Sequence, residues 1–164
     1  MSNKAQAPPF EIRLAVVDES SVVSSLLLAA FGPYRSGYTD DAFEYTTPSA
    51  EVIEPRFAEG PIWLAVDGDE AIGTVSGMPE SGRFYIRSMA VKPSAQGRGV
   101  GQRLLDTLDE YAREQGFSKL YLYTTFVLPA AQLMYEKNGF YVVRETPPEE
   151  WFGVGGIEME KILD

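Results

Sequence analysis

The sequence predicts a single mixed α/β domain with a mostly antiparallel sheet and helices packed against it. Short runs rich in β-branched and aromatic residues, typical of strands, interchange along the chain with segments of helical periodicity. The length of 164 residues suits one domain, and no internal repeat or low-complexity linker divides it. The expected order of elements is β-α-α-β-β-β-α-β-α-β-β.

The N-terminal part is expected to hold one strand and two helices after a flexible leader at residues 1–9. The residues from Asp18 to Ser21 are typical of a helix start, and Gly32-Pro33 stops that helix. The expected elements are strand Phe10–Val17, a helix carrying the apolar residues between Val22 and Ala30, a polar aromatic loop Tyr34–Thr47 and a helix Ser49–Phe57.

A β-meander follows, and helices and strands alternate after it. Asp67-Gly68-Asp69 is typical of a hairpin turn, and the helix that begins near Gly99 carries a strong apolar face. The expected elements are strands Ile62–Val66, Ala71–Gly77 and Arg83–Val91 with a turn at Pro79–Gly82, helix Gly99–Gln115, strand Leu120–Phe126, helix Ala130–Asn138, and strands Phe140–Glu145 and Gly156–Ile162.

Composition excludes several function classes. The chain has no histidine and no cysteine, which rules out Ser-His-Asp triads, histidine bases, thiolate metal sites and cysteine nucleophiles. A net charge of −10 argues against general nucleic-acid binding, because neutralising phosphates needs an excess of Lys and Arg. No apolar run is long enough for a membrane helix and the N-terminus does not resemble a signal peptide, so a cytoplasmic protein without membrane association is expected.

The most informative stretch joins a predicted strand to a helix through a glycine-rich turn, Gln96-Gly97-Arg98-Gly99-Val100-Gly101. Glycines let the backbone turn tightly and approach a ligand, and the unpaired N–H groups at a helix N-terminus favour phosphate. Arg98 adds a cation, so the stretch is interpreted as a cradle for a polyanion. A tight turn without a ligand is the alternative. The spacing does not fit a Rossmann fingerprint, and no Lys-Ser/Thr pair follows as in a P-loop.

Two motifs resemble the GNAT acetyltransferase superfamily. Gln96, Gly99 and Gly101 match the acyl-CoA-binding motif Gln/Arg-x-x-Gly-x-Gly/Ala of that family, and Ala90-Val91-x-Pro93 is similar to its strand before the motif. Ala131–Phe140 resembles the family's late helix, Ala-x-x-x-Tyr-Glu-Lys-x-Gly-Phe. The two motifs lie the expected distance apart, and the element order agrees over almost the whole chain.

The resemblance implies acetyl-CoA as co-substrate, no metal, and a role for each matching position. The backbone of the strand at Met89, Ala90 and Val91 would pair with the pantetheine arm, and Tyr135 would protonate the departing thiolate. A buried aromatic without a catalytic role is the alternative for Tyr135. The backbone N–H groups of Gly97, Arg98, Gly99, Val100 and Gly101 would hold the pyrophosphate, and Gln96 of the motif is also implied to bind the cofactor.

Two departures from the family pattern concern the site. Members often have Asn seven residues before the helix Tyr, where this chain has Leu128. Some relatives place a Glu on the strand before the motif, but Phe84–Lys92 contains no carboxylate. A base is therefore either a carboxylate elsewhere acting through water, with Glu44 and Glu80 as candidates, or not needed.

Charge and aromatic content suggest the acceptor. Between Tyr38 and Gly82 there are ten acids and one base, whereas between Arg83 and Leu105 there are five bases and no acid. The acidic stretch favours a cationic amine drawn in by the field; a solubilising surface is the alternative. The aromatic candidates for an acceptor pocket are Trp63, Tyr34, Tyr38, Phe43, Tyr45 and Trp151, with Trp63 assigned to the sheet.

The sequence therefore predicts an N-acetyltransferase that moves an acetyl group from acetyl-CoA to a small-molecule or peptide amine by direct attack in a ternary complex. A non-catalytic acyl-CoA-binding sensor or partner-supporting module is the main alternative, and a nucleotide-binding regulatory domain is another. A homodimer with Trp151-Phe152 at its seam is also considered.

Overall fold

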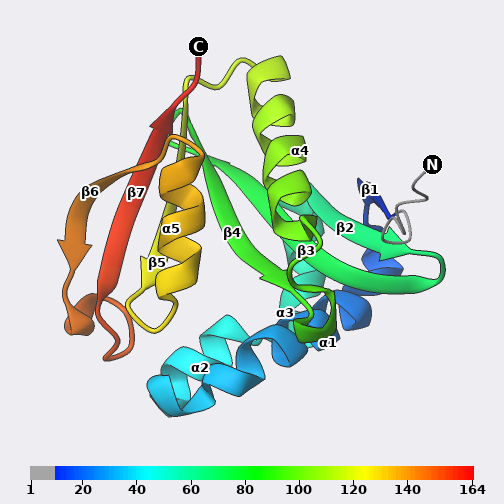
Figure 1. The fold of residues 1–164 in the computed structure, drawn as a ribbon, viewed down its shortest axis with the longest axis horizontal. Helices are drawn as coiled ribbons and strands as arrows, with labels where there is room; N and C mark the ends of the chain where they lie inside the picture. Colours follow the sequence, from blue (N-terminus) through cyan, green and yellow to red (C-terminus); the bar gives the residue numbers. More distant parts are fainter. Residues whose placement is uncertain (1–9) are drawn as a thin grey trace, which may run out of the picture.

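One seven-stranded sheet organises the chain (Figure 1). The computed structural model describes residues 10–164, so the leader expected at residues 1–9 lies outside the described residues. The strand order is β1-β2-β3-β4-β5-β7-β6, and only β4 and β5 run parallel to each other. The strands are β1 Glu11–Leu14, β2 Ile62–Asp67, β3 Glu70–Glu80, β4 Arg83–Val91, β5 Lys119–Thr125, β6 Tyr141–Thr146 and β7 Gly156–Ile162. The mixed, mostly antiparallel sheet expected from the sequence is confirmed.

Helices lie on both faces of the sheet. The α-helices are α1 Ser20–Phe31, α2 Asp40–Thr46, α3 Ala50–Ile53, α4 Val100–Glu114 and α5 Pro129–Lys137. On one face, α4 and α5 pack against apolar side chains from strands β2 to β5 and β7. On the other face, α1 and α3 cover β2 and part of β4. No helix within residues 10–164 is long and apolar enough to cross a membrane.

The helix α4 shows how the pattern of the sequence becomes packing. Its residues Val100, Leu104, Leu105 and Leu108 recur at helical spacing, and each is at most 2% exposed. Burying each Leu contributes about 1.5–3 kcal/mol relative to leaving it in water. The face they form fixes α4 on the sheet and thereby fixes where its N-terminus lies.

The prediction of a loop over Tyr34–Thr47 is wrong. The segment forms a 3₁₀-helix, Gly32–Gly37, and then the helix α2. Thr39 caps α2, since its side-chain oxygen accepts a hydrogen bond from the N–H of Ala42 at 3.1 Å. The acids Asp40 and Asp41 then stand in the first turn, where the helix dipole favours negative charge.

Other boundaries also differ from the prediction. The strand expected over Phe10–Val17 spans only Glu11–Leu14, and Val17–Glu19 form a 3₁₀-helix. The α-helix expected over Ser49–Phe57 ends at Ile53 and continues as a 3₁₀-helix, because Pro55 has no N–H for α-helical pairing. The turn expected at Pro79–Gly82 is shorter, since β3 runs on to Glu80 and only Ser81 and Gly82 turn, both with positive φ. The predicted bounds of β4 and β7 are confirmed.

Candidate active site

The parallel strands β4 and β5 separate soon after they meet. Their register contains only the pairs Phe84↔Leu120 and Tyr85↔Tyr121. From Ile86 to Val91 the edge of β4 that faces β5 has no partner strand in the described part of the chain, and Figure 1 shows the two strands diverging below their meeting point. An unpaired strand edge offers backbone N–H and C=O groups to an extended ligand.

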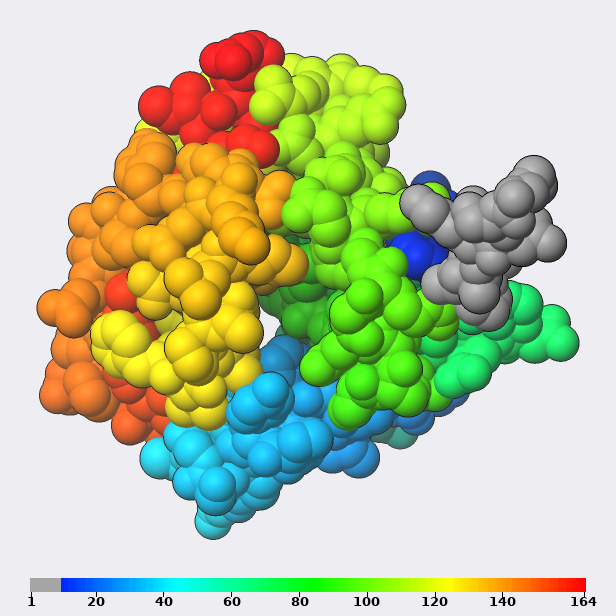
Figure 2. Space-filling model, in the orientation of Figure 1, coloured from blue at the N-terminus to red at the C-terminus, as the bar shows by residue number. Residues whose placement is uncertain are grey.

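A cavity of about 370 Å³ opens at this separation. Figure 2 shows this face of the molecule hollowed between the α5 segment, the residues just before α4 and the N-terminal helical segment. Its walls come from β4, β5, α2, α5 and the segment between β6 and β7. The lining residues used below are Tyr38, Tyr45, Tyr85, Arg87, Ser88, Met89, Tyr123, Leu128, Tyr135, Glu150 and Trp151.

The glycine-rich turn lies directly before α4. Gly97 and Gly99 have φ of 83° and 79°, and a Cβ built on either would meet no heavy atom within 4 Å. The first backbone bond of α4 joins the N–H of Arg103 to the C=O of Gly99, so the N–H groups of Val100, Gly101 and Gln102 have no helical acceptor. Open space and unpaired donors at the positive end of a helix suit a pyrophosphate, so these residues fit the expected ligand.

Three elements converge between the turn and the cavity. A Cβ on Gly101 would lie 3.5 Å from Met134 Sδ of α5 and 3.5 Å from Met89 Cε of β4. These are ordinary contact distances, so the N-terminus of α4 packs directly beside β4 and α5. The strand edge, the helix N-terminus and α5, which the sequence analysis placed in one site, lie side by side.

Tyr135 connects α5 with the unpaired part of β4. Its side chain is 7% exposed and lines the cavity, and its hydroxyl donates to Met89 Sδ at 3.6 Å. Burial raises the pKa of this phenol above its ordinary value, because the phenolate would lose its hydration. The hydroxyl therefore stays protonated at neutral pH and is able to donate a proton.

The carboxylates proposed as bases lie elsewhere. Glu44 is exposed and does not line the cavity, and Glu80 accepts a hydrogen bond from the Tyr121 hydroxyl. Leu128, which stands where relatives often have Asn, precedes the first turn of α5 and contributes an apolar patch to the wall. Within residues 10–164 no group of acidic side chains is arranged to hold a metal ion.

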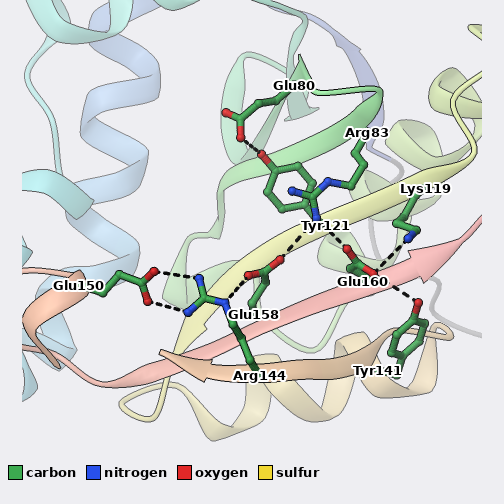
Figure 3. A network of polar contacts seen from close by, with 9 residues as sticks. All are labelled: Glu80, Arg83, Lys119, Tyr121, Tyr141, Arg144, Glu150, Glu158 and Glu160. Atoms are coloured by element: carbon green, nitrogen blue, oxygen red, sulfur yellow. Dashed lines mark hydrogen bonds and ion pairs between the residues drawn. The ribbon is translucent and has the colours of Figure 1, made fainter. Parts of the chain in front are cut away.

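Glu150 is the carboxylate on the cavity wall, and the sequence analysis missed it. Arg144 holds it with two hydrogen bonds of 2.8 Å and donates a third of 2.8 Å to Glu158. Figure 3 shows this contact continuing across the sheet through Glu158, Arg83 and Glu160. The network fixes the segment after β6 against the sheet and places Glu150 beside the cavity.

Aromatic side chains also line the cavity. Tyr45 and Trp151 meet edge to face with ring centroids 6.0 Å apart, and Trp151 meets Tyr38 at 6.2 Å. Thr39 Oγ1 donates to the Phe152 carbonyl at 2.6 Å, which joins α2 to the segment before β7. Of the aromatic candidates, Tyr38, Tyr45 and Trp151 line the cavity, Trp63 is buried in the sheet as assigned, and Tyr34 and Phe43 do not line the cavity.

Three acids of the acidic stretch pair with three bases of the basic stretch. Ion pairs join Asp67 to Arg98 at 3.0 Å, Glu70 to Lys92 at 2.6 Å and Glu59 to Arg87 at 2.8 Å. None of the ten acids between Tyr38 and Gly82 lines the cavity. Any attraction of a cation by these acids is therefore a field over the surface rather than a contact in the pocket.

Comparison with known proteins gives a consistent result. Residues 25–140 match the family described as the acetyltransferase (GNAT) family. The chain is 34% identical over 89 residues to the mouse protein named probable N-acetyltransferase family 8 member 5. The aligned part covers 51% of this chain and 39% of that protein. Human N-acetyltransferase 8B is 26% identical over 135 residues, and the aligned part covers 77% of this chain and 58% of that protein. The chain thus spans between two-fifths and three-fifths of the length of these relatives.

Solved structures share the fold. A PaiA N-acetyltransferase from Thermoplasma acidophilum, in complex with coenzyme A, superposes with a TM-score of 0.81 at 18% identity, covering 94% of this chain and 99% of that one. A GNAT family acetyltransferase from Elizabethkingia anophelis, with acetyl-CoA bound, gives a TM-score of 0.72 at 22% identity, covering 96% and 100%.

Proposed function

The chain belongs to the acetyltransferase (GNAT) family, and from that premise we propose that it transfers an acetyl group from acetyl-CoA to a primary amine. The observation that carries the proposal is that three features lie side by side. Part of the unpaired edge of β4 and the buried Tyr135, whose hydroxyl is 3.6 Å from Met89, line the cavity, and the N-terminus of α4 lies against Met89 and α5 at Gly101.

Two parts of the site would hold acetyl-CoA. The backbone of Met89, Ala90 and Val91 would bind the pantetheine arm as if it were a further strand. The N–H groups of the turn would bind the pyrophosphate, and Gly97 and Gly99 leave the space that this requires. The crystal structures of two proteins with this fold contain coenzyme A or acetyl-CoA, which supports the choice of co-substrate.

The chemistry would be a direct transfer with both substrates bound. The neutral amine attacks the thioester carbonyl, so a C–N bond forms and the C–S bond breaks, while the amine nitrogen loses a proton to water, and a proton from water restores the Tyr135 hydroxyl after it has donated. A backbone N–H near Met89 would stabilise the developing charge on the carbonyl oxygen, and Tyr135 would give its proton to the departing sulfur. No cysteinyl intermediate is available, because the chain contains no cysteine.

The proposed acceptor is an amine that is cationic in solution. The aromatic wall at Tyr38, Tyr45 and Trp151 suits a cation, because ring faces attract positive charge. The neighbouring α2 carries three acids and no base, and the chain has a net charge of −10. Both features favour the approach of a positively charged substrate.

Ionic strength tests the steering of that acceptor. Raising the salt concentration should lower kcat/KM for a diamine, because salt screens the field of the acidic surface, and leave kcat nearly unchanged. An uncharged amide analogue in a binding assay serves as control for general salt effects. A kcat/KM that does not change with salt contradicts electrostatic steering.

Two observations favour the alternative of a non-catalytic acyl-CoA-binding module. Leu128 stands where the family often has Asn, and Glu150, the one carboxylate that residues 10–164 contribute to the wall, is paired with Arg144. Release of free thiol from acetyl-CoA, measured with and without amine, separates the two. The enzyme releases thiol faster when amine is added, whereas the module binds acetyl-CoA without amine-dependent release.

A homodimer and a cytoplasmic location stay predictions. Trp151 packs against Tyr38 and Tyr45 of its own chain. Phe152 is 45% exposed, so of the two residues proposed for a dimer interface it is the one more accessible to a second copy.

A further inference from the structure

One end of the cavity carries more positive charge than its neighbours neutralise. Arg87 and Ser88 of β4 line the cavity there, and Arg56, from the 3₁₀-helix after α3, lies behind them. The two arginines are close enough for Arg87 to contribute to lowering the pKa of Arg56. Only one acid in the described residues, Glu59, forms an ion pair with either of them.

Arg56 is a buried cation with a neutral partner. Arg56 is 9% exposed, and its Nη1 donates a hydrogen bond to the Ser88 hydroxyl at 3.1 Å. Burial lowers the pKa of this guanidinium, and the nearby charge of Arg87 lowers it further. A buried positive charge is costly unless an anion compensates it, so this position favours an anion nearby.

Arg87 has hydrogen-bonding capacity left. Its Nη2 donates to Glu59 at 2.8 Å, and its Nε is buried without an acceptor. Its side chain is only 14% exposed, so bulk water gives limited compensation. Glu59 is therefore the compensation that the structure shows for this guanidinium, and an anion in the cavity would add to it.

Ser88 lines the cavity and contacts Arg56 behind it. Its φ of 56° is rare for a residue other than glycine, and the register between β3 and β4 shifts at this point. The Ser88 oxygen accepts from Arg56, which leaves its own hydrogen free to donate into the cavity. Strained backbone of this kind tends to persist where it positions a functional group.

We propose that the amine acceptor also carries a carboxylate, which Arg87 and Ser88 bind at this end of the cavity. This inference rests on the proposed function and narrows its substrate class to amines of the amino-acid type. A carboxylate is planar and accepts paired hydrogen bonds from a guanidinium, and it would neutralise the surplus charge of Arg56 and Arg87. The aromatic wall remains available to the amine end of the same molecule.

Matched substrates test the inference. We would measure amine-dependent thiol release with L-phenylalanine, L-leucine and 4-aminobutyrate, each beside its carboxamide. At least one acid should exceed its amide in kcat/KM by about 10- to 100-fold, the value of hydrogen bonds to a charged group. Equal kcat/KM for every acid and its amide overturns the inference and leaves the proposed acetyltransferase intact.

Substitutions at Arg87 test whether this residue causes the preference for the acid over its amide. Arg87→Gln should lower kcat/KM for the acid about 10- to 100-fold and for the amide less than about threefold, because only the acid uses the guanidinium. Arg87→Lys should recover part of the loss. Arg113→Gln removes the same charge from the surface of α4, far along the helix from the turn, and should change neither substrate. An Arg87→Gln protein that keeps the preference overturns the inference.

If no amine causes thiol release, the proposed function is contradicted. A binding measurement then tests the carboxylate site by itself. Thermal unfolding of the protein with coenzyme A is followed with each acid and each amide. Stabilisation by an acid that is absent with its amide and lost in Arg87→Gln supports the carboxylate site. No stabilisation by any of the acids overturns it.

Discussion

The Tyr135→Phe protein should turn over acetyl-CoA and amine about 100- to 1000-fold more slowly than the wild type, which is the usual contribution of a general acid. The substitution removes one hydroxyl and keeps the ring, so its packing on Phe140 at 5.5 Å is preserved. The Kd for acetyl-CoA should change less than about threefold, because the groups proposed to bind it are backbone N–H and C=O groups elsewhere. Stopped-flow or steady-state thiol release and calorimetric titration measure the two quantities.

The pH profile gives a second readout of the same residue. Burial raises the pKa of Tyr135, so the acid form persists as pH rises, and wild-type kcat should not fall on the alkaline side below the ordinary phenol pKa of about 10. Tyr111→Phe is the control, since that residue packs on Trp63 and Phe84 and does not line the cavity. Equal kcat for wild type and Tyr135→Phe removes Tyr135 from the mechanism.

Replacing Gly99 with aspartate should weaken acetyl-CoA binding about 100-fold or more, because it would disturb at least two charge-assisted hydrogen bonds worth about 1.5–3 kcal/mol each. The new carboxylate would stand at the N-terminus of α4, in the space left open for the pyrophosphate, and repel it. Calorimetric titration of acetyl-CoA measures the effect.

Gly82→Asp is the matched control for this change. Gly82 has φ of 80°, against 79° for Gly99, and it too has no heavy atom within 4 Å of a built Cβ, but it lies in the turn between β3 and β4. Both variants therefore carry similar backbone strain and the same added charge. Loss of affinity in Gly99→Asp alone supports the cradle, whereas equal affinity in both proteins contradicts it.

Local signals were enough to predict most of the fold. β4 and β7 begin and end where their composition and turns predict, and α4 follows its apolar periodicity. The helix α2 was missed because it is short and depends on contacts from far along the chain. Thr39 bonds to Phe152, 113 residues away, and Tyr45 packs on Trp151. The cap Thr39 followed by two acids was the available local signal.

The site divides in the same way. The glycine-rich turn and Tyr135 lie in continuous motifs, so they could be predicted from the sequence. Glu150, Arg56 and Ser88 carry no motif and reach the cavity only through the sheet and the connections around it. The charge pattern was also incomplete as a signal, because it could not show that Glu59 pairs with Arg87 and Asp67 with Arg98.

Thermal unfolding with and without acetyl-CoA, with ATP and NAD as controls, tests the central claim that the split between β4 and β5 and the turn before α4 bind acetyl-CoA. At a ligand concentration about 100 times Kd the protein should gain about 2.7 kcal/mol, which raises Tm by about 5–10 °C for a domain of this size. ATP and NAD should give no comparable shift. No shift with acetyl-CoA at millimolar concentration would mean that the glycine-rich segment is only a turn, and the acetyltransferase account would be contradicted.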